Sequence, residues 1–321
     1  MTVLRRMPAT GPGHPARPAR PRRRVLLAGT VPVLPVLIPV LAGCATGAAT
    51  LSCLAGETRA LPGALDESSG AAWSGRDGGV FWTVNDGGQG DLFAVDTTGA
   101  LLARIETEGS RLRDVEDLAG APCPPGYCLY LADTGDNDER RDQVALHRLA
   151  EPDLDDDQVE RTAFPMRFPD GPRDVEALIV LPGERVFLVT KGRAHPPTVY
   201  RYPGPLTADS VRTLEALSVI GRGPSTFMGR ITGASHVPGT ADQVLIRSYE
   251  SLTLYRLSDA GLESLPGSRL SLTSLEEAQG EAVAADGSGR VLLTSEAGPL
   301  AARGTFRILR CQIGEDGPSA S

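Results

Sequence analysis

The sequence lacks the short motifs of several common enzyme classes. Its 321 residues contain no P-loop, no G-x-G-x-x-G fingerprint, no G-x-S-x-G elbow and no H-E-x-x-H pair. Nucleotide, dinucleotide and serine-hydrolase chemistries therefore have no positive support. Lysine occurs once, at Lys191, and asparagine twice, at Asn85 and Asn137. With 41% hydrophobic residues and only five cysteines, the chain is neither disordered, nor collagen-like, nor a small disulfide-stapled peptide.

Positive charge is concentrated at the amino terminus. The first 43 residues hold seven arginines and no acidic residue. Without them, 25 of the 32 basic residues face 40 acidic ones, so the net charge of −8 becomes −15. Such a surface repels a phosphate backbone, and we expect no nucleic-acid partner. Glycine (37) and proline (26) make up about a fifth of the chain, which favours many turns over long helices.

The first 43 residues have the layout of a secretory signal peptide. Arginines up to Arg24 precede an apolar run over 25–43, and small residues lead to Cys44. The Leu-Ala-Gly-Cys ending resembles a bacterial lipobox, in which the cysteine is lipidated and becomes the mature N-terminus. Three prolines in the run argue against a permanent transmembrane helix.

From this layout we predict a lipoprotein signal peptide over 1–43, lipidation of Cys44 and a spacer over 44–50. The expected location is the outer face of the cytoplasmic membrane, with the membrane as a partner through the lipid. General secretion and twin-arginine export both stay open.

Export gives the other four cysteines a meaning, because disulfides persist outside the cytoplasm. Cys123 and Cys128 bracket a Pro-Pro-Gly-Tyr segment and predict a local disulfide. Cys53 is then left to pair with Cys311, which would join the two ends of the mature domain.

One pattern recurs five times along the chain. An apolar strand is followed by a Gly- or Pro-bearing turn, a second strand and a short third strand, as in hairpins. The repeats are anchored at Gly70, Glu116, Glu176, Thr232 and Glu281, which are 46, 60, 56 and 49 residues apart. A fourth strand follows in the first four units. Four-stranded units of this period are typical of β-propeller blades.

The fifth unit runs out of chain after its third strand. The segment 52–61 can supply the missing strand, and this would place Cys53 beside Cys311. We therefore predict an all-β, five-bladed β-propeller over 51–312, closed by its N-terminal strand, with a tail over 313–321. A six-bladed ring and a β-sandwich are the alternatives.

The first strand of a propeller blade lines the central channel, and the second runs antiparallel to it. Starts of first strands and ends of second strands therefore meet at one end of the axis. Glu116, Glu176 and Glu281 start first strands, and Asp114 and Asp174 precede two of them. We predict an acidic funnel whose ligand-binding residues are Asn85, Asp86, Lys191, Arg247 and Glu296.

Carboxylates that crowd one funnel repel each other unless something neutralises them. Ca²⁺ takes six to eight oxygen ligands and suits this set. The candidate metal ligands are Glu116, Asp133, Asp136, Asn137, Glu176 and Glu281. The alternative is a metal-free network in which Lys191 and Arg247 pair with the acids.

Four stretches carry a family resemblance: Trp82-Thr-Val-Asn-Asp-Gly-Gly88, Asp114-Val-Glu-Asp-Leu-Ala119, Leu131-Ala-Asp-Thr-Gly-Asp-Asn137 and Asp170-Gly-Pro-Arg-Asp-Val-Glu-Ala-Leu178. Together they resemble a group of exported actinobacterial propeller lipoproteins, mostly of unassigned function. More distantly, the chain is similar to phytase-like and lactonase-like propellers, in which axial carboxylates and Asn hold Ca²⁺. That kinship implies metal ligation by Glu116, Glu176, Glu281 and Asn137.

Three functional hypotheses follow. The preferred one is a lipid-anchored, extracytoplasmic binding protein whose acidic funnel takes an unknown small molecule or envelope protein. The second is a Ca²⁺-dependent hydrolase of an ester, lactone or phosphate ester, with Glu116 and Lys191 as candidate catalytic residues. The third is a structural envelope scaffold that binds proteins at its blade rims.

Overall fold

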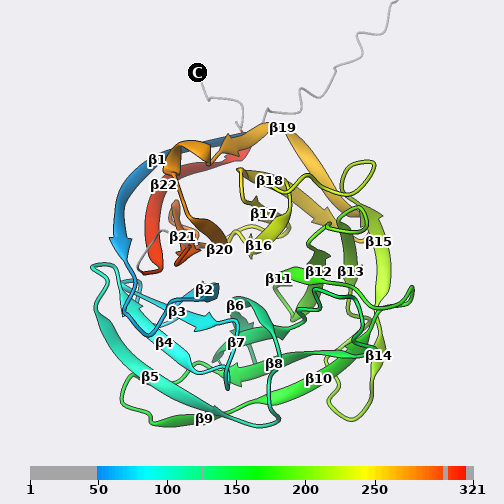
Figure 1. Ribbon diagram of the computed structural model, residues 1–321, viewed down its shortest axis with the longest axis horizontal. Helices are drawn as coiled ribbons and strands as arrows, with labels where there is room; N and C mark the ends of the chain where they lie inside the picture. Colours follow the sequence, from blue (N-terminus) through cyan, green and yellow to red (C-terminus); the bar gives the residue numbers. More distant parts are fainter. Residues whose placement is uncertain (1–48, 125, 299–302, 316–321) are drawn as a thin grey trace, which may run out of the picture. The chain divides into compact units, whose positions relative to one another are not determined.

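Five β-sheets surround a central axis, as Figure 1 shows. The computed structural model describes residues 49–298 and 303–315, apart from Pro125. Within this part, every element is a strand except the 3₁₀ turn η1 (Thr273–Leu275). No helix among the described residues has the length and apolar character needed to cross a membrane. The predicted five-bladed β-propeller is confirmed.

The blades follow one another in chain order, and each is built from the axis outward. Blade 1 contains β2 (Ser68–Trp73), β3 (Val80–Asn85), β4 (Leu92–Asp96), β5 (Leu101–Glu108) and β9 (Gln158–Glu160). Blade 2 contains β6 (Val115–Cys123), β7 (Gly126–Asp133), β8 (Val144–Ala150), β10 (Thr162–Arg167) and β14 (Arg212–Thr213). Blade 3 contains β11 (Val175–Leu181), β12 (Arg185–Thr190), β13 (Thr198–Arg201) and β15 (Glu215–Val219). Blade 4 contains β16 (Ile231–His236), β17 (Gln243–Ser248), β18 (Ser251–Ser258) and β19 (Gly261–Ser271). Blade 5 contains β20 (Gln279–Ala285), β21 (Arg290–Glu296), β22 (Thr305–Glu315) and β1 (Ala49–Ala60).

Two short strands leave their own part of the sequence to extend the preceding blade. After β8 of blade 2, the chain forms β9, which pairs in parallel with β5 of blade 1. Likewise β14, which comes between β13 and β15 of blade 3, pairs in parallel with β10 of blade 2. The repeat did not reveal these strands, which tie neighbouring blades together at the outer edge.

The ring closes through its own amino-terminal strand. β1 pairs antiparallel with β22, and the two strands lie side by side in Figure 1. Cys53 stands directly opposite Cys311, and a disulfide joins them with Cα atoms 4.0 Å apart. A second disulfide joins Cys123 and Cys128. Both predicted disulfides and the predicted closing strand are confirmed.

The innermost strands β2, β6, β11, β16 and β20 contact one another all the way around the ring. This approach requires small residues. A Cβ on Gly70 would lie 2.3 Å from the backbone nitrogen of Leu118, and one on Gly233 would lie 2.8 Å from the carbonyl oxygen of Glu281. Between the blades, large side chains such as Trp82, Tyr200 and Phe306 fill the core.

A buried carboxylate links three of these innermost strands. Asp117 in β6 is fully buried, and its side chain accepts backbone N–H bonds from Leu118 (2.8 Å), Leu178 in β11 (2.8 Å) and Ala234 in β16 (3.3 Å). Burial raises the pKa of Asp117 well above its usual value, while these N–H groups oppose the rise. At the end of the channel where the innermost strands finish, there is a cavity of about 30 Å³ lined by residues such as Gly120, Val180 and Ala285. The channel is therefore narrow at this end.

Candidate functional site

A β-bulge opens the first strand of every blade at the same position. The ladder between first and second strands shifts register around one residue in blades 1 to 4, and around two residues in blade 5. We call the residues at the bulges the inner tier: Ser69, Glu116, Glu176, Thr232 and Glu281. Bulges re-aim side chains, which explains why this ring of residues stands apart from the regular alternation.

The inner tier corrects the sequence alignment in blade 1. The sequence repeat placed Gly70 at the same position as the glutamates. In the structure Gly70 pairs with Val84 in the way that Asp117, the residue after Glu116, pairs with Ala132. Ser69 is therefore the residue of blade 1 that corresponds to Glu116. Ser69 is buried, and its hydroxyl has no hydrogen-bond partner among the described residues.

A second ring follows the ends of the second strands. Asn85, Asp133, Thr190 and Ser248 pair with the residues just before the bulges of blades 1 to 4. The residues that come next, with Glu296 at the end of β21, form the outer tier: Asp86, Thr134, Lys191, Tyr249 and Glu296. Four of the five carry a charge or a phenol.

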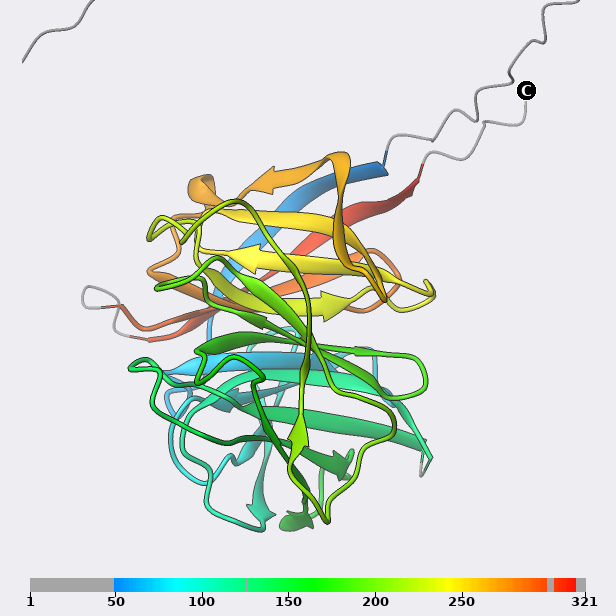
Figure 2. The same ribbon diagram turned by 90° about the vertical axis from the view of Figure 1, so that its right-hand side faces the viewer.

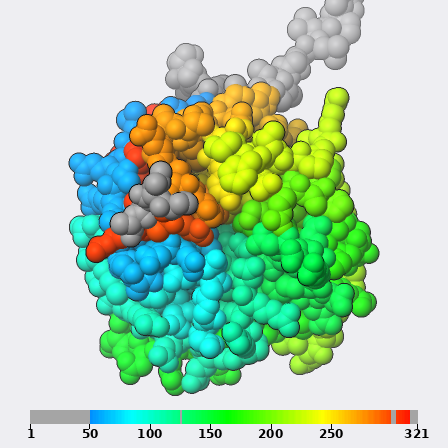
Figure 3. All heavy atoms as spheres, in the orientation of Figure 1, coloured from blue at the N-terminus to red at the C-terminus, as the bar shows by residue number. Residues whose placement is uncertain are grey.

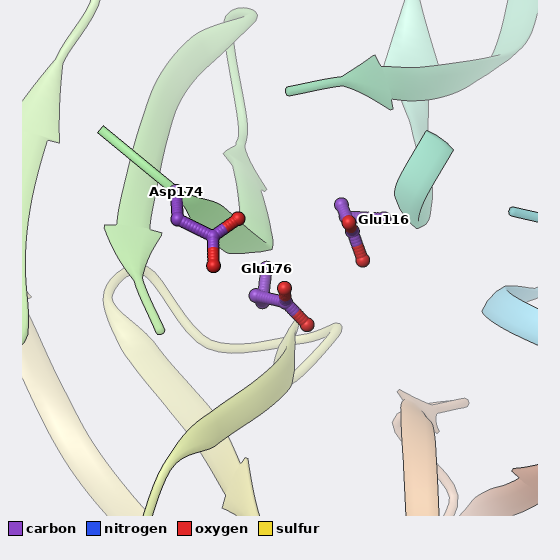
Figure 4. A group of neighbouring side chains, drawn as sticks. All are labelled: Glu116, Asp174 and Glu176. Atoms are coloured by element: carbon purple, nitrogen blue, oxygen red, sulfur yellow. The ribbon is translucent and has the colours of Figure 1, made fainter. Parts of the chain in front are cut away.

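Three carboxylates converge where blades 2 and 3 meet. Figure 4 shows the side chains of Glu116, Asp174 and Glu176 as neighbours. One carboxylate oxygen from each of these residues lies within 4.8 Å of the others. Asp174 is only 3% exposed: its Oδ1 accepts the backbone N–H of Asp136 at 3.0 Å, whereas Oδ2 has no partner among the described residues. A buried carboxylate oxygen without a donor is costly unless a further group completes it.

The carboxyl groups of the two tiers have raised pKa values. Burial, followed by repulsion from Glu176 and Asp114, raises the pKa of Glu116 well above its usual value. Burial also raises the pKa of Glu176 to about 7, despite the opposing charge of Lys191. For Glu281, burial and then the charges of Glu176 and Glu296 raise the pKa well above normal. Lys191 is the cation that acts on all three glutamates, and its single charge does not offset their burial and mutual repulsion.

Lys191 supplies the one ammonium group of the tiers. Its Nζ donates to Glu176 Oε1 at 2.6 Å, and the side chain is only 13% exposed. Burial works against the ammonium charge, but the carboxylates of Glu176 and then Glu116 raise the pKa of Lys191 overall. Lys191 therefore stays protonated and neutralises one carboxylate.

In blade 5, Gln279 bridges the two tiers. Its Nε2 donates to Glu281 Oε1 at 2.9 Å and to Glu296 Oε2 at 2.7 Å. Burial, followed by the charges of Asp86 and Glu67, raises the pKa of Glu296 to about 7. The predicted residues Glu281, Glu296 and Asp86 thus belong to one electrostatic unit with Glu116, Glu176 and Lys191.

The Asp133-Thr-Gly-Asp136 segment supports the site rather than facing it. Arg141 holds this segment through Asp133 Oδ1 at 2.9 Å and through the carbonyl oxygens of Asp133 and Gly135. Its backbone N–H donates to Asp136 Oδ2 at 2.7 Å. A Cβ on Gly135 would lie 2.2 Å from Glu116 Oε1 and 2.4 Å from Asp114 Cγ, so a larger residue here would displace those carboxylates.

Several predicted ligands do not belong to the three-carboxylate cluster. Asp133 and Asp136 are buried, and Asp133 Oδ1 and Asp136 Oδ2 accept hydrogen bonds from Arg141 and backbone N–H groups, whereas Asn137 is exposed on the loop. Asn85 is half-buried, and its Nδ2 donates to the carbonyl oxygen of Ala64 at 2.9 Å. Asp133 and Asp136 each use one oxygen to hold the loop, and neither belongs to the cluster of Glu116, Asp174 and Glu176.

Arg247 does not line the mouth. Its side chain is fully buried, and NH1 donates to the carbonyl oxygens of Ala282 (2.6 Å) and Thr294 (2.9 Å). NH2 pairs with Glu277 at 2.6 Å. The guanidinium thus joins blade 4 to blade 5, because carbonyl groups of blade 5 point at it.

The sequence analysis did not identify the two aromatic residues of the site, Tyr249 and Phe227. Tyr249 occupies the outer tier, and burial followed by the charge of Glu281 raises the pKa of its phenol. Its ring stacks on Phe227, with centroids 5.2 Å apart and planes 16° apart. Aligning the residues after each second strand would have found Tyr249 beside Lys191 and Glu296. Asp174, noted in the sequence only as a neighbour of Glu176, likewise belongs to the site.

Phe227 belongs to a loop over 221–230 that is tied to both neighbouring blades. The backbone N–H of Ser225 donates to Gly192 at 2.8 Å, next to Lys191, and that of Glu250 donates to Met228 at 3.1 Å. Phe227 is 62% exposed and Met228 is 42% exposed. The loop therefore presents apolar side chains at the edge of the acidic mouth.

Comparison with known proteins identifies the fold alone. No family model matches the sequence, and no curated protein matches it either. Among solved structures, the chain is similar to the PQQ-bound form of an aldose sugar dehydrogenase from Streptomyces coelicolor, with a TM-score of 0.50 and 13% identity over 82% of this chain and 98% of that one. It is also similar to a luciferin-regenerating enzyme, with a TM-score of 0.48 and 11% identity over 82% and 99% of the chains.

Proposed function

We propose that the protein is an extracytoplasmic binding protein whose axial mouth holds a divalent cation, with Ca²⁺ as the best fit. The observation that carries this is the convergence of Glu116, Asp174 and Glu176 within 4.8 Å, with the buried Asp174 Oδ2 lacking a partner among the described residues. An all-oxygen donor set suits a hard cation rather than a transition metal.

The residues fit such an ion. Lys191 occupies only Oε1 of Glu176, which leaves other carboxylate oxygens of the three residues as donors. The raised pKa values of Glu116 and Glu176 come first from burial and then from neighbouring carboxylates, and a bound cation would offset both. When bound, the ion would supply positive charge that attracts an oxygen atom of a ligand. This chain's part is to hold the ion through the carboxylate oxygens of Glu116, Asp174 and Glu176.

Calorimetry on chelator-treated protein tests the cation site. Titration with Ca²⁺ should show saturable binding, and Glu176→Gln should weaken it by about tenfold or more. Glu263→Gln, which removes the same charge from an exposed site on β19, is the matched control and should keep wild-type affinity. Absence of binding to the wild-type protein, or equal losses in both variants, would refute the proposal.

We further propose that the propeller is anchored by lipid on Cys44 at the outer face of the cytoplasmic membrane. The two disulfides support an oxidising compartment. Fractionation of cells that express the full chain tests this. The wild-type protein should sediment with membranes and incorporate labelled fatty acid, whereas Cys44→Ser should not incorporate it. Label on the Cys44→Ser protein would contradict the assignment.

A hydrolase is the second candidate, because the mouth contains carboxyl groups that titrate near neutrality. The pKa of Glu296 is raised to about 7, the range in which a carboxyl group serves as general acid or base. A panel of esters, lactones and phosphate esters, assayed with and without Ca²⁺, tests this. Turnover that Glu296→Gln abolishes while Ca²⁺ binding persists would favour the hydrolase over the binding protein.

A further inference from the structure

The two tiers carry more negative charge than one divalent cation neutralises. With every carboxyl group ionised, their five carboxylates face one ammonium, a formal charge of −4, and the flanking Asp114 and Asp174 bring it to −6. The raised pKa values of Glu116, Glu176, Glu281 and Glu296 mean that protons carry part of the neutralisation until a cation binds. Arg230 on the rim and a divalent ion together leave −3. An anionic ligand would therefore be repelled, whereas a cation would be attracted.

The aromatic side of the mouth matches a cation with an apolar body. Tyr249 stands in the outer tier between blades that carry Lys191 and Glu296 and interacts electrostatically with Glu281, Glu176 and Glu296. Behind it, Phe227 stacks at 5.2 Å between centroids. Aromatic faces beside carboxylates are the usual setting for ammonium groups, since the ring quadrupole and the negative charges act together.

The rim itself already contains one such contact. The guanidinium carbon of Arg230 lies 5.0 Å from the centroid of the Phe227 ring. Phe227 and Met228 nevertheless leave much of their apolar surface in water, 62% and 42% exposed. In the space-filling view, blades 3 and 4 form adjoining green and yellow sectors (Figure 3), and the loop that carries these residues lies between them in the sequence.

We propose that the mouth binds an organic cation, an amine or quaternary ammonium on an apolar body. Its charged head lies among Tyr249, Glu281 and Glu296, and its body rests on Phe227 and Met228. This inference rests on the proposed binding function of the same mouth and names its ligand class. A carbohydrate, whose ring would stack on the aromatics without charge, is the competing class.

Calorimetry with matched probes distinguishes these ligands. Choline and benzyltrimethylammonium should bind the Ca²⁺-loaded full-length protein, with the second tighter because of its larger body. The neutral isostere 3,3-dimethylbutan-1-ol should bind at least tenfold more weakly than choline. Equal binding of the isostere, binding of methyl glucoside instead, or no binding of either ammonium probe would overturn the proposal.

Two variants locate the site. Tyr249→Leu should weaken benzyltrimethylammonium binding by about tenfold, whereas Tyr249→Phe, which keeps the ring, should stay within about threefold. Ca²⁺ affinity measured on the same samples separates the two proposals. If Ca²⁺ binds the wild-type protein and the ammonium probes do not, only this inference is overturned. If the ammonium probes bind the wild-type protein and Ca²⁺ does not, only the Ca²⁺ site is overturned. Equal ammonium affinity in Tyr249→Leu and the wild type would place the ligand elsewhere and refute the assignment.

Discussion

The disulfide between Cys53 and Cys311 should contribute more stability than the one between Cys123 and Cys128. The first spans 258 residues and closes the ring, whereas the second spans five. In the chain-entropy description, a cross-link restricts the unfolded chain by an amount that grows with the logarithm of this span. The two spans give about 5.5 and about 2 kcal/mol at 25 °C.

These free energies convert into melting temperatures. A unit of about 270 residues has an unfolding entropy of about 0.56 kcal/mol per kelvin at its midpoint. The double variant Cys53→Ser, Cys311→Ser should therefore melt about 10 °C below the wild-type protein. The double variant Cys123→Ser, Cys128→Ser, which removes the same number of sulfur atoms, should melt only about 4 °C lower.

Differential scanning calorimetry of the oxidised proteins measures both shifts, and urea unfolding gives the free energies independently. Equal losses of melting temperature in the two double variants would contradict the dependence on loop length. They would mean that the chain ends already stay close together in the unfolded state without the disulfide. A larger loss in the Cys123–Cys128 variant would refute the reasoning outright.

Three further predictions concern the mouth and blade 2. Gly135→Ala should weaken Ca²⁺ binding by about tenfold or more, because the added Cβ overlaps Glu116. Gly87→Ala is the control and should keep wild-type affinity in calorimetry, because no atom lies within 4 Å of its added Cβ. Lys191→Met should raise Ca²⁺ affinity and lower the melting temperature of the metal-free protein, since it removes the counter-ion of Glu176; the opposite signs would contradict the site. Burial, followed by the charge of Arg161, lowers the pKa of His147 to about 4, so folding stability should fall by up to about 3 kcal/mol as pH drops from about 6.5 to 4. Urea unfolding should show that His147→Gln lacks this component; identical pH profiles would exclude it.

The sequence was most informative where one physical requirement recurs. Each blade must alternate apolar residues over four strands, so the period was visible, and the incomplete fifth unit pointed to the segment that became β1. Closure then placed Cys53 against Cys311. The same recurrence exposed Glu116, Glu176 and Glu281, because the bulge position repeats with the blade.

The side-chain directions were less accessible. Around a bulge the strict alternation of a strand breaks, so counting residues does not reveal which way Arg247 points. The structure shows it buried against blade 5. Asp133 and Asp136 matched the chemistry of a metal ligand, but Arg141, five residues beyond Asp136, competes for their oxygens. Tyr249 was missed because a phenol is neutral at ordinary pH, and only its position directly after β17 marks it as a member of the outer tier.

The antiparallel pairing of β1 and β22 also fixes an orientation. β22 starts beside the mouth and runs away from it, and β1 runs the other way, so Ala49 and Glu315 pair at the far face, where both strands end in Figure 2. Only four residues separate Ala49 from Cys44, a reach of at most about 18 Å. A lipid on Cys44 would therefore hold the far face against the bilayer and turn the acidic mouth outward, where ligands arrive by diffusion from the surroundings rather than along the membrane.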